Sequence, residues 1–167
     1  KTVTIAVTNV NEAPQITSNG GGASAAIGVA ENTTVVTTVK ASDPDAGAKL
    51  SYAIAGGADA SKFTIDASTG ALAFKTAPDF EVKADAGANN VYDVVVRVSD
   101  GTLSDTQAIA VTVSNVNEAP VITSNAGGAS AAVSVVENKT VVTTVKASDP
   151  DAGTKLSYAI TGGADAS

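Results

Sequence analysis

The sequence contains no cysteine, histidine, methionine or tryptophan, and these absences exclude several kinds of chemistry. Without cysteine the chain forms no disulfide and offers no thiolate ligand, and without histidine it lacks the commonest acid–base group and transition-metal ligand. Aromatic residues make up only 4% of the chain, so stacking platforms for single-stranded nucleic acid are missing. Most enzyme chemistry is therefore disfavoured.

Positive charge and long apolar runs are also scarce. The chain has 10 lysines and arginines against 17 acids, a net charge of −7 that repels phosphate backbones and anionic membrane surfaces. Its apolar runs are far shorter than the roughly 18 residues that span a bilayer, and the N-terminus lacks a signal pattern. We expect no nucleic-acid partner and no membrane insertion, and the acidity favours cations as partners.

The clearest positive feature is an internal repeat. The phrase NVNEAP stands at residues 9–14 and again at 115–120, and residues 1–61 match 107–167 with 46 identities and 15 differences, a period of 106. We expect residues 1–12 to be the last strand and linker of a preceding repeat, 13–118 a complete repeat, and 119–167 the first half of the following one. The chain would then be a window cut from a longer tandem array.

Alternating apolar residues predict β-strands throughout. Tyr92, Val94, Val96 and Val98 share one face of a strand, with polar residues on the other face. The same alternation predicts strands at 109–113, 3–7, 35–41, 50–54, 63–65 and 72–74, and one more in the glycine-rich segment before Glu31. About seven short strands in a repeat, without helical periodicity, predict an all-β fold, an antiparallel Greek-key β-sandwich of the cadherin or immunoglobulin type, in tandem repeats.

The acids concentrate at strand ends and in the linkers. Eleven of the 17 lie there: Glu12, Glu31, Asp43, Asp45, Asp79, Glu81, Asp100, Glu118, Glu137, Asp149 and Asp151. Taken singly, DPDAG and SDG are typical of turns, and NEAP of a linker stiffened by proline. Asp85, Asn89 and Asn90 in KADAGANN could hold an ion, but a hairpin loop is the better interpretation.

Taken together, five motifs in order resemble the cadherin-like repeat, particularly that of very large secreted bacterial adhesins. They are VAEN at Glu31, DPDAG at Asp43 and Asp45, DFE at Asp79 and Glu81, VRVSDG at Asp100, and the NVNEAP linker. Two departures stand out. Asn9 and Asn115 occupy positions where the family prefers aspartate, and Glu12 and Glu118 replace another aspartate, which leaves two or three ions per junction open.

The resemblance implies calcium binding at the linkers between repeats. The second junction would use Glu31, Asp79, Glu81, Asn115, Asn117, Glu118, Asp149 and Asp151. The first junction would use Asn11, Glu12, Asp43, Asp45 and Asp100. Independently of the resemblance, many carboxylate and amide oxygens suit Ca²⁺, which takes six to eight hard oxygen ligands in flexible geometry.

Three classes of function compete. We favour a calcium-rigidified spacer in an extracellular or cell-surface adhesin, with neighbouring repeats of the same polypeptide as partners. The alternative is a direct adhesive module for glycan or homophilic contacts, which an exposed aromatic patch would support, but Tyr52, Tyr92 and Tyr158 are all predicted to point inward. A glycosidase using Asp79 and Glu81 is disfavoured, because these acids belong to a motif that recurs at junctions.

Overall fold

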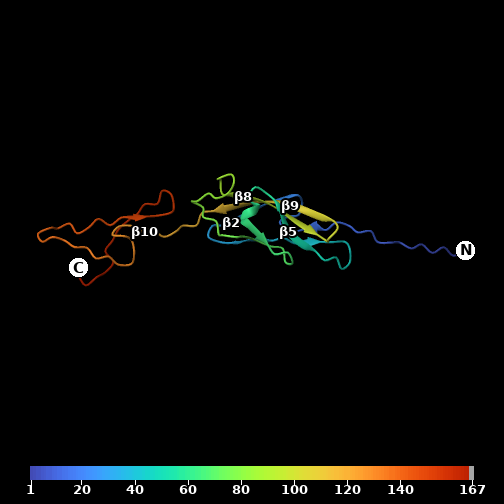
Figure 1. The fold of residues 1–167 in the computed structure, drawn as a ribbon, viewed down its shortest axis with the longest axis horizontal. Helices are drawn as coiled ribbons and strands as arrows, with labels where there is room; N and C mark the ends of the chain where they lie inside the picture. Colours follow the sequence, from blue (N-terminus) through green and yellow to red (C-terminus); the bar gives the residue numbers. More distant parts are fainter. Residues whose placement is uncertain (166–167) are drawn as a thin grey trace. The chain divides into compact units, whose positions relative to one another are not determined.

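The computed structural model describes residues 1–165, which divide into two compact units, residues 1–115 and the residues from 116 onward (Figure 1). Each unit is described by itself, and we call them unit 1 and unit 2. The last two residues of the expected half repeat, Ala166 and Ser167, lie outside the described part. Over residues 1–165 the chain forms strands and one short 3₁₀ turn but no α-helix, and so no helix that could cross a bilayer.

Unit 1 contains a four-stranded sheet in the order β2-β9-β8-β5. Its strands are β2 (Ser24–Ala30), β5 (Ser51–Gly56), β8 (Val91–Ser99) and β9 (Ser104–Ser114). The hairpin of β8 and β9 is the longest pairing, running antiparallel from Val91 opposite Thr112 to Ser99 opposite Ser104. This hairpin forms the framework on which the rest of the unit packs.

One pairing in this sheet differs from the wholly antiparallel arrangement that the sequence predicts. Strand β2 runs parallel to β9, from Ser24 beside Ala108 to Ala30 beside Ser114. A parallel pair needs a long crossover between its strands, and here the crossover is the entire chain between Ala30 and Ser104. Alternation identifies the buried face of a strand but carries no information on its direction, so the sequence pattern could not reveal this pairing.

The second sheet of unit 1 has three antiparallel strands in the order β3-β7-β6. They are β3 (Val35–Thr38), β6 (Phe63–Ile65) and β7 (Ala71–Phe74), and the 3₁₀ turn η1 (Ala60–Lys62) leads directly into β6. The two sheets supply side chains to a single hydrophobic core, as a sandwich requires.

The core confirms the predicted inward faces of β8 and β9. Its buried apolar members are Ile16, Val39, Phe63, Leu72, Phe74, Tyr92, Val94, Val96, Val98, Ile109, Val111 and Val113. Three aromatic rings lie at its centre. The rings of Phe63 and Phe74 stack with centroids 4.5 Å apart, and Tyr92 meets Phe74 edge-on at 5.1 Å.

One buried polar contact lies at the start of β9. The side chain of Gln107 is fully buried, and its Nε2 donates to the Gly22 carbonyl at 3.0 Å. Asn19 Nδ2 donates to Gln107 Oε1 at 3.2 Å, while Asn19 itself has the left-handed φ of +55°. These contacts fix the glycine-rich segment before β2 against the sheet, a role that the alternating pattern does not predict.

A short strand pair recurs in the two units with the same register. In unit 1, β1 (Gln15–Ile16) pairs antiparallel with β4 (Ala41–Ser42), and in unit 2, β10 (Val121–Ile122) pairs with β11 (Ala147–Ser148). Gln15 lies opposite Ser42, and Val121, which is 106 residues later, lies opposite Ser148. Near-identical sequence therefore gives the same local structure. The expected repeat boundaries, after residues 12 and 118, stay a prediction.

The strand expected at residues 3–7 does not form. Val3, Ile5 and Val7 are 77%, 81% and 93% exposed, and the segment runs as an extended chain away from the sheets (Figure 1). Alternating apolar residues become a strand only when another strand supplies the hydrogen-bonding partners. The corresponding residues of β9 pair with both β8 and β2, whereas residues 3–7 have no strand beside them among the described residues.

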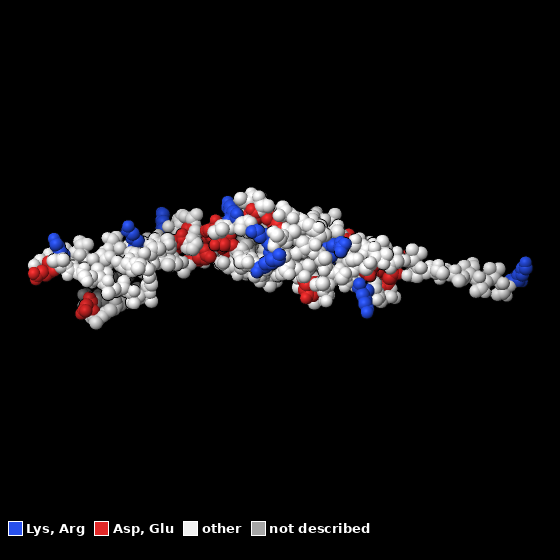
Figure 2. Space-filling model, in the orientation of Figure 1, with Lys and Arg blue, Asp and Glu red and all other residues white. Residues whose placement is uncertain are grey.

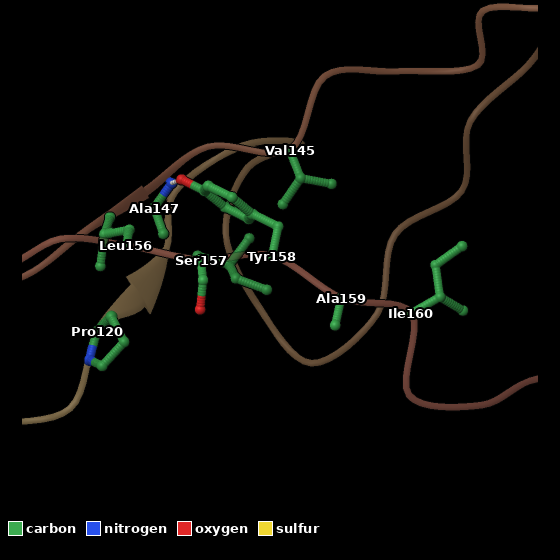
Figure 3. A pocket seen from close by; sticks show the side chains of 9 residues that line it. Pro120, Val145, Ala147, Leu156, Ser157, Tyr158, Ala159 and Ile160 are labelled. Atoms are coloured by element: carbon green, nitrogen blue, oxygen red, sulfur yellow. Dashed lines mark hydrogen bonds between the residues drawn. The ribbon is translucent and has the colours of Figure 1, made fainter.

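Unit 2 has an open apolar face for the same reason. In unit 1 the strands β2, β3 and β5 pair with β9, β7 and β8, and the described residues of unit 2 form no equivalents of these partners. Tyr158, predicted to point inward, is instead 56% exposed. Its ring lies over an open hollow of about 540 Å³ with Leu156 and Val145, and its hydroxyl accepts the Ala147 N–H at 3.2 Å (Figure 3).

Candidate metal centre

The first candidate ligand, Glu31, directly follows the last residue of β2. Its side chain is only 1% exposed. Its backbone N–H donates to the Ser114 carbonyl at 3.0 Å, continuing the ladder between β2 and β9, and its Oε2 accepts the Phe80 N–H at 2.7 Å. A carboxylate this deeply buried needs hydrogen-bond partners, because a buried polar group without them costs free energy.

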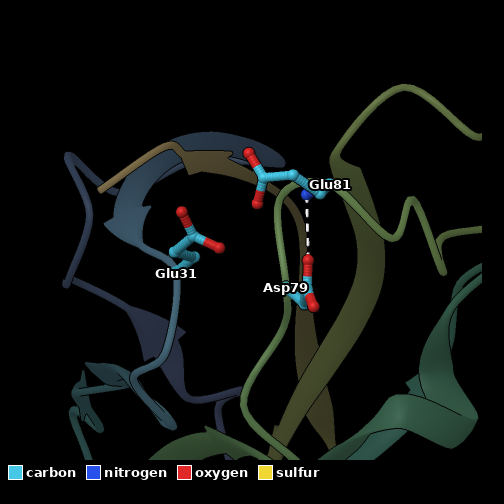
Figure 4. A group of neighbouring side chains, drawn as sticks. All are labelled: Glu31, Asp79 and Glu81. Atoms are coloured by element: carbon cyan, nitrogen blue, oxygen red, sulfur yellow. Dashed lines mark hydrogen bonds between the residues drawn. The ribbon is translucent and has the colours of Figure 1, made fainter. Parts of the chain in front are cut away.

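Asp79 and Glu81 lie in the loop after β7 and face Glu31. Asp79 Oδ1 accepts the N–H groups of Glu81 at 2.9 Å and Val82 at 3.0 Å, an aspartate-capped turn that fixes the loop (Figure 4). The Pro78 carbonyl accepts the Asn32 N–H at 2.9 Å, which ties the same loop to the end of β2. The local sequence PDFE therefore folds so that one carboxylate oxygen of each acid comes within 4.8 Å of a Glu31 oxygen.

These three carboxylates form a cluster that could hold a metal ion. One oxygen from each of Glu31, Asp79 and Glu81 lies within 4.8 Å of the others. Two unit negative charges at that separation repel by roughly 0.9 kcal/mol even in bulk water, and by more beside a buried group. Asn115 adds an amide, since its Nδ2 donates to Glu81 Oε1 at 3.0 Å. We call the three carboxylates of Glu31, Asp79 and Glu81 the Glu31 cluster.

A second acidic group of unit 1 surrounds its linker. Glu12 donates its backbone N–H to Asp45 Oδ2 at 2.8 Å, and the Asp45 N–H donates to Asp43 Oδ1 at 2.8 Å. Asn11 Nδ2 donates to Asp100 Oδ2 at 2.7 Å. The five residues predicted for the first junction therefore lie together. Acidic side chains gather in patches on the surface drawn in Figure 2.

Hydrogen bonds from the linker lower the pKa of two of these acids. The Asn9 side chain, and after it the Glu12 N–H, holds the pKa of Asp45 below its usual value. The Asn11 side chain, followed by the N–H groups of Thr102 and Leu103, lowers the pKa of Asp100. Both carboxylates are thus kept ionised, the form that a cation requires.

Unit 2 repeats the linker contact of unit 1. The Glu118 N–H donates to Asp151 Oδ2 at 2.7 Å, and the Asp151 N–H donates to Asp149 Oδ1 at 3.0 Å. Asn117 Nδ2 donates to the Glu118 carbonyl at 3.0 Å, as Asn11 Nδ2 does to the Glu12 carbonyl at 3.3 Å. The candidate ligands of the second junction thus form two separate groups. Asn115 lies with the Glu31 cluster in unit 1. In unit 2, Asn117 and Glu118 lie with Asp149 and Asp151 of the DPDAG sequence, whose equivalent in unit 1 is residues 43–45 and which we call the DPD loop.

Two asparagines outside the predicted ligand set contact these groups. Asn9, noted only as a departure from the family pattern, hydrogen-bonds Asp45. Asn90 donates through Nδ2 to the Phe80 carbonyl at 2.9 Å, between the two acids of the DFE motif. The recurrence of NVNEAP could have pointed to Asn9, but no spacing in the sequence connects Asn90 with Phe80.

The loop containing Asp85, Asn89 and Asn90 is not the expected hairpin loop, because it connects β7 of the three-stranded sheet to β8 of the four-stranded sheet, but its own aspartate organises it. Asp85 Oδ2 accepts the Asn89 N–H and Oδ1 the Asn90 N–H, both at 2.9 Å. Burial raises the pKa of Asp85, but these backbone donors outweigh it and the net shift is downward. Both Asp85 oxygens therefore have donors within the protein.

Comparison with known proteins agrees with this architecture. The sequence model of the cadherin domain matches residues 26–114. No curated protein matches the chain.

Three solved structures illustrate the similarity in fold. The human protocadherin-24 EC1-2 structure is 24% identical with a TM-score of 0.53, covering 70% of this chain and 50% of that one. The protocadherin gammaB7 EC3-6 cis-dimer is 26% identical with a TM-score of 0.53, covering 85% and 37%. Human CDH23 EC21-23 is 20% identical with a TM-score of 0.58, covering 88% and 47%. The chain thus spans half or less of each of these structures.

Cadherin domains are extracellular adhesion modules without enzymatic activity, and they generally bind Ca²⁺. The matched segment begins within β2 and ends at the last residue of β9, so it includes both sheets of unit 1. The match covers more than half of the sequence, and the chain belongs to the cadherin domain family.

Proposed function

We propose that this chain is a calcium-rigidified spacer of a large extracellular adhesin, of the kind that bacteria secrete or display on their surface. Ca²⁺ binds at the linkers between repeats and fixes the orientation of successive β-sandwiches. The number of repeats then sets the reach of the protein, while a separate module contacts the target. Neighbouring repeats of the same polypeptide are the direct partners.

The observation that carries this proposal is the Glu31 cluster. Three carboxylates within 4.8 Å, one of them 1% exposed, repel one another in the absence of a cation. A divalent ion reverses the sign of that interaction. Flexible carboxylate and amide oxygens suit Ca²⁺ better than Mg²⁺, which demands a near-ideal octahedron and retains its waters.

The linker contacts support the other half of the proposed site. In unit 2 the backbone of Glu118 is fastened to Asp151, so the linker and the DPD loop present their oxygens together. We infer that ions at the second junction use the Glu31 cluster with Asn115 on one side and Asn117, Glu118, Asp149 and Asp151 on the other. At the first junction the ligands come from the linker and from the repeat that follows it: Asn11, Glu12, Asp43, Asp45 and Asp100.

Calcium binding to the folded state alone stabilises it by mass action. At a free calcium concentration 100 times the dissociation constant, the gain is about 2.7 kcal/mol per site. That gain matters here because the core consists largely of valine with three aromatic rings and no tryptophan. We therefore expect the chain to reach its full stability in the calcium concentrations outside the cell.

The alternative, a direct adhesive module for glycan or homophilic contacts, has less support. In unit 1 the aromatic side chains Tyr52, Phe63, Phe74, Phe80 and Tyr92 all lie in the core or pack against it. An exposed aromatic platform, the usual basis of a strong contact surface, is therefore missing from the described part of this unit. The protocadherin gammaB7 structure named above is a cis-dimer, so self-association of this chain is worth measuring by sedimentation.

The decisive experiment compares the wild-type chain and Glu81→Gln with Ca²⁺, with Mg²⁺ and with chelator. For the wild type we expect Ca²⁺ to raise the Tm and to lengthen the particle in small-angle scattering, and Mg²⁺ to do neither to the same degree. For Glu81→Gln both responses should shrink. Wild-type melting curves and scattering profiles that are identical in calcium and chelator contradict the proposal.

A further inference from the structure

The residue between the two acids of the DFE motif is held at both of its backbone polar groups. The Phe80 N–H donates to Glu31 Oε2 at 2.7 Å, and the Phe80 carbonyl accepts Asn90 Nδ2 at 2.9 Å. Both partners are buried, Glu31 with 1% and Asn90 with 3% of the side chain exposed. The two peptide groups that these contacts fix set the directions in which the Asp79 and Glu81 side chains leave the backbone.

Asn90 is itself anchored on two sides. Its N–H donates to Asp85 Oδ1 at 2.9 Å, and its carbonyl accepts the Val113 N–H of β9 at 2.9 Å. It has the left-handed φ of +62°, which asparagine tolerates better than most residues. Asn90 therefore connects the loop after β7 to the central hairpin of the sheet.

The support behind Asn90 extends into a second buried aspartate. Asp59, 3% exposed, accepts the Ala86 N–H at 2.7 Å and the Asp93 N–H of β8 at 2.9 Å. Because Asp59 accepts the Ala86 N–H and Asp85 accepts the Asn89 and Asn90 N–H groups, the loop at 85–90 is fastened to the sheet. The backbone of Asn90 therefore lies in a loop that is fixed to the sheet.

The orientation of the Asn90 amide shows which of its atoms matters. A carbonyl oxygen such as that of Phe80 accepts hydrogen bonds, so the Nδ2 end must face it. The Oδ1 atom is then buried without a hydrogen-bond partner, which costs free energy. The hydrogen bond from Nδ2 to the Phe80 carbonyl is the side-chain contact that offsets this cost.

We propose that Asn90 is a positioning residue of the calcium site: it acts through the Phe80 backbone to hold Asp79 and Glu81 at ligand geometry. This inference depends on the calcium function proposed above. Residues that orient metal ligands without touching the metal typically change affinity by about 10- to 100-fold when they are removed. None of the five motifs that carry the family resemblance includes Asn90, and its position before β8 gives it access to the loop.

The test uses Asn90→Gly in the 167-residue chain. Glycine keeps the positive φ and the backbone contacts to Asp85 and Val113 while removing only the side-chain amide. A calcium titration followed by NMR at the amide signals of Phe80 and Glu81 reports this site separately from the first junction. We expect about 10-fold weaker binding at these signals.

Asn19→Gly provides the matched control. Asn19 also has a left-handed φ, +55°, and its Nδ2 likewise donates to a buried group, Gln107 Oε1 at 3.2 Å. Gln107 lies seven residues before Ser114 on β9, about 23 Å from the Glu31 end of the strand at roughly 3.3 Å per residue. Asn19→Gly should lower the Tm in chelator without changing calcium affinity at Phe80 and Glu81.

The outcomes separate the two proposals. If wild-type signals do not respond to calcium, the proposed function fails and this inference fails with it. If the wild type binds calcium and Asn90→Gly binds it equally well, only the positioning role is overturned. Should Asn90→Gly not fold in chelator, Asn90→Asp replaces it, because aspartate keeps the shape but removes the donor to Phe80. Unchanged affinity in that variant has the same meaning.

Discussion

Glu31 and Phe80 are 49 residues apart in the sequence and meet through one hydrogen bond of 2.7 Å from the Phe80 N–H to Glu31 Oε2. The Phe80 side chain packs against the core, while its neighbours Asp79 and Glu81 complete the Glu31 cluster. A change in the charge of the cluster therefore acts on the same loop that covers part of the core. Calcium binding and folding stability are coupled through this loop.

Glu81→Gln should change stability in opposite directions with and without calcium. In chelator, removal of one of three mutually repelling carboxylates stabilises the fold by up to about 1 kcal/mol per relieved contact. In calcium the variant loses a ligand and should be less stable than the wild type. Urea unfolding in the two buffers measures both signs.

Glu137→Gln is the control for Glu81→Gln, because it removes the same charge from an exposed position of unit 2. Its effect should be small and of similar size in both buffers. A Glu81→Gln variant that is less stable than the wild type in chelator would mean that the three carboxylates do not repel one another in the folded protein.

The aromatic trio should dominate the stability of unit 1. Phe74→Ala removes the ring that stacks on Phe63 at 4.5 Å and meets Tyr92 at 5.1 Å, and we expect a loss of about 3–5 kcal/mol. Val35→Ala, at a side chain that is 74% exposed, should cost less than about 0.5 kcal/mol. Urea midpoints in calcium compare the two variants. Equal losses of stability in Phe74→Ala and Val35→Ala would mean that Phe74 is not a core residue.

Two glycines with similar φ angles should respond differently to alanine. A Cβ on Gly70 (φ +72°) would lie 2.2 Å from the Val39 carbonyl oxygen, whereas a Cβ on Gly47 (φ +84°) meets nothing within 4 Å. Gly47→Ala therefore costs only the left-handed conformation, about 1 kcal/mol, and Gly70→Ala adds a displacement of the backbone of Val39. We expect the Tm to fall clearly further for Gly70→Ala, and equal Tm values would contradict the close approach.

Stability should fall at acidic pH. The N–H and hydroxyl of Thr69, and then the Ser68 N–H, lower the pKa of Asp66, so below its unfolded value of about 3.9 the unfolded state binds more protons. The contribution of Asp66 to the free energy of unfolding is present above that pH, and it is lost as the pH falls through the pKa of Asp66 in the folded protein. Asp45, Asp85 and Asp100 have lowered pKa values as well. Urea midpoints between pH 2 and 6 should decline, and Asp66→Asn should decline less steeply than the wild type.

Much of the fold could be predicted because the pattern of residues is local. The alternation in β8 and β9 identifies Tyr92, Val96 and Ile109 as core residues, and all three are buried. The same alternation was wrong for Val3 and Tyr158, since a strand also needs a partner and a pattern cannot say whether one is present. The parallel pairing of β2 was missed because strand direction depends on the crossover.

The candidate site also has a part that the sequence could predict and a part that it could not. Glu31, Asp79 and Glu81 could be grouped in advance because the order of five motifs resembles a known repeat, and the structure places these carboxylates together. That they bind calcium stays a prediction. Asn90 could not be foreseen, because its contact with Phe80 exists only when the connection between β7 and β8 folds back on itself.

The clasp between linker and DPD loop uses a main-chain donor in both units, Glu12 N–H to Asp45 and Glu118 N–H to Asp151. Any amino acid except proline supplies that donor. The side chain at position 118 can therefore be exchanged to tune ion affinity without removing the backbone hydrogen bond to Asp151. An engineered array could in this way combine joints of graded calcium sensitivity on one unchanged scaffold.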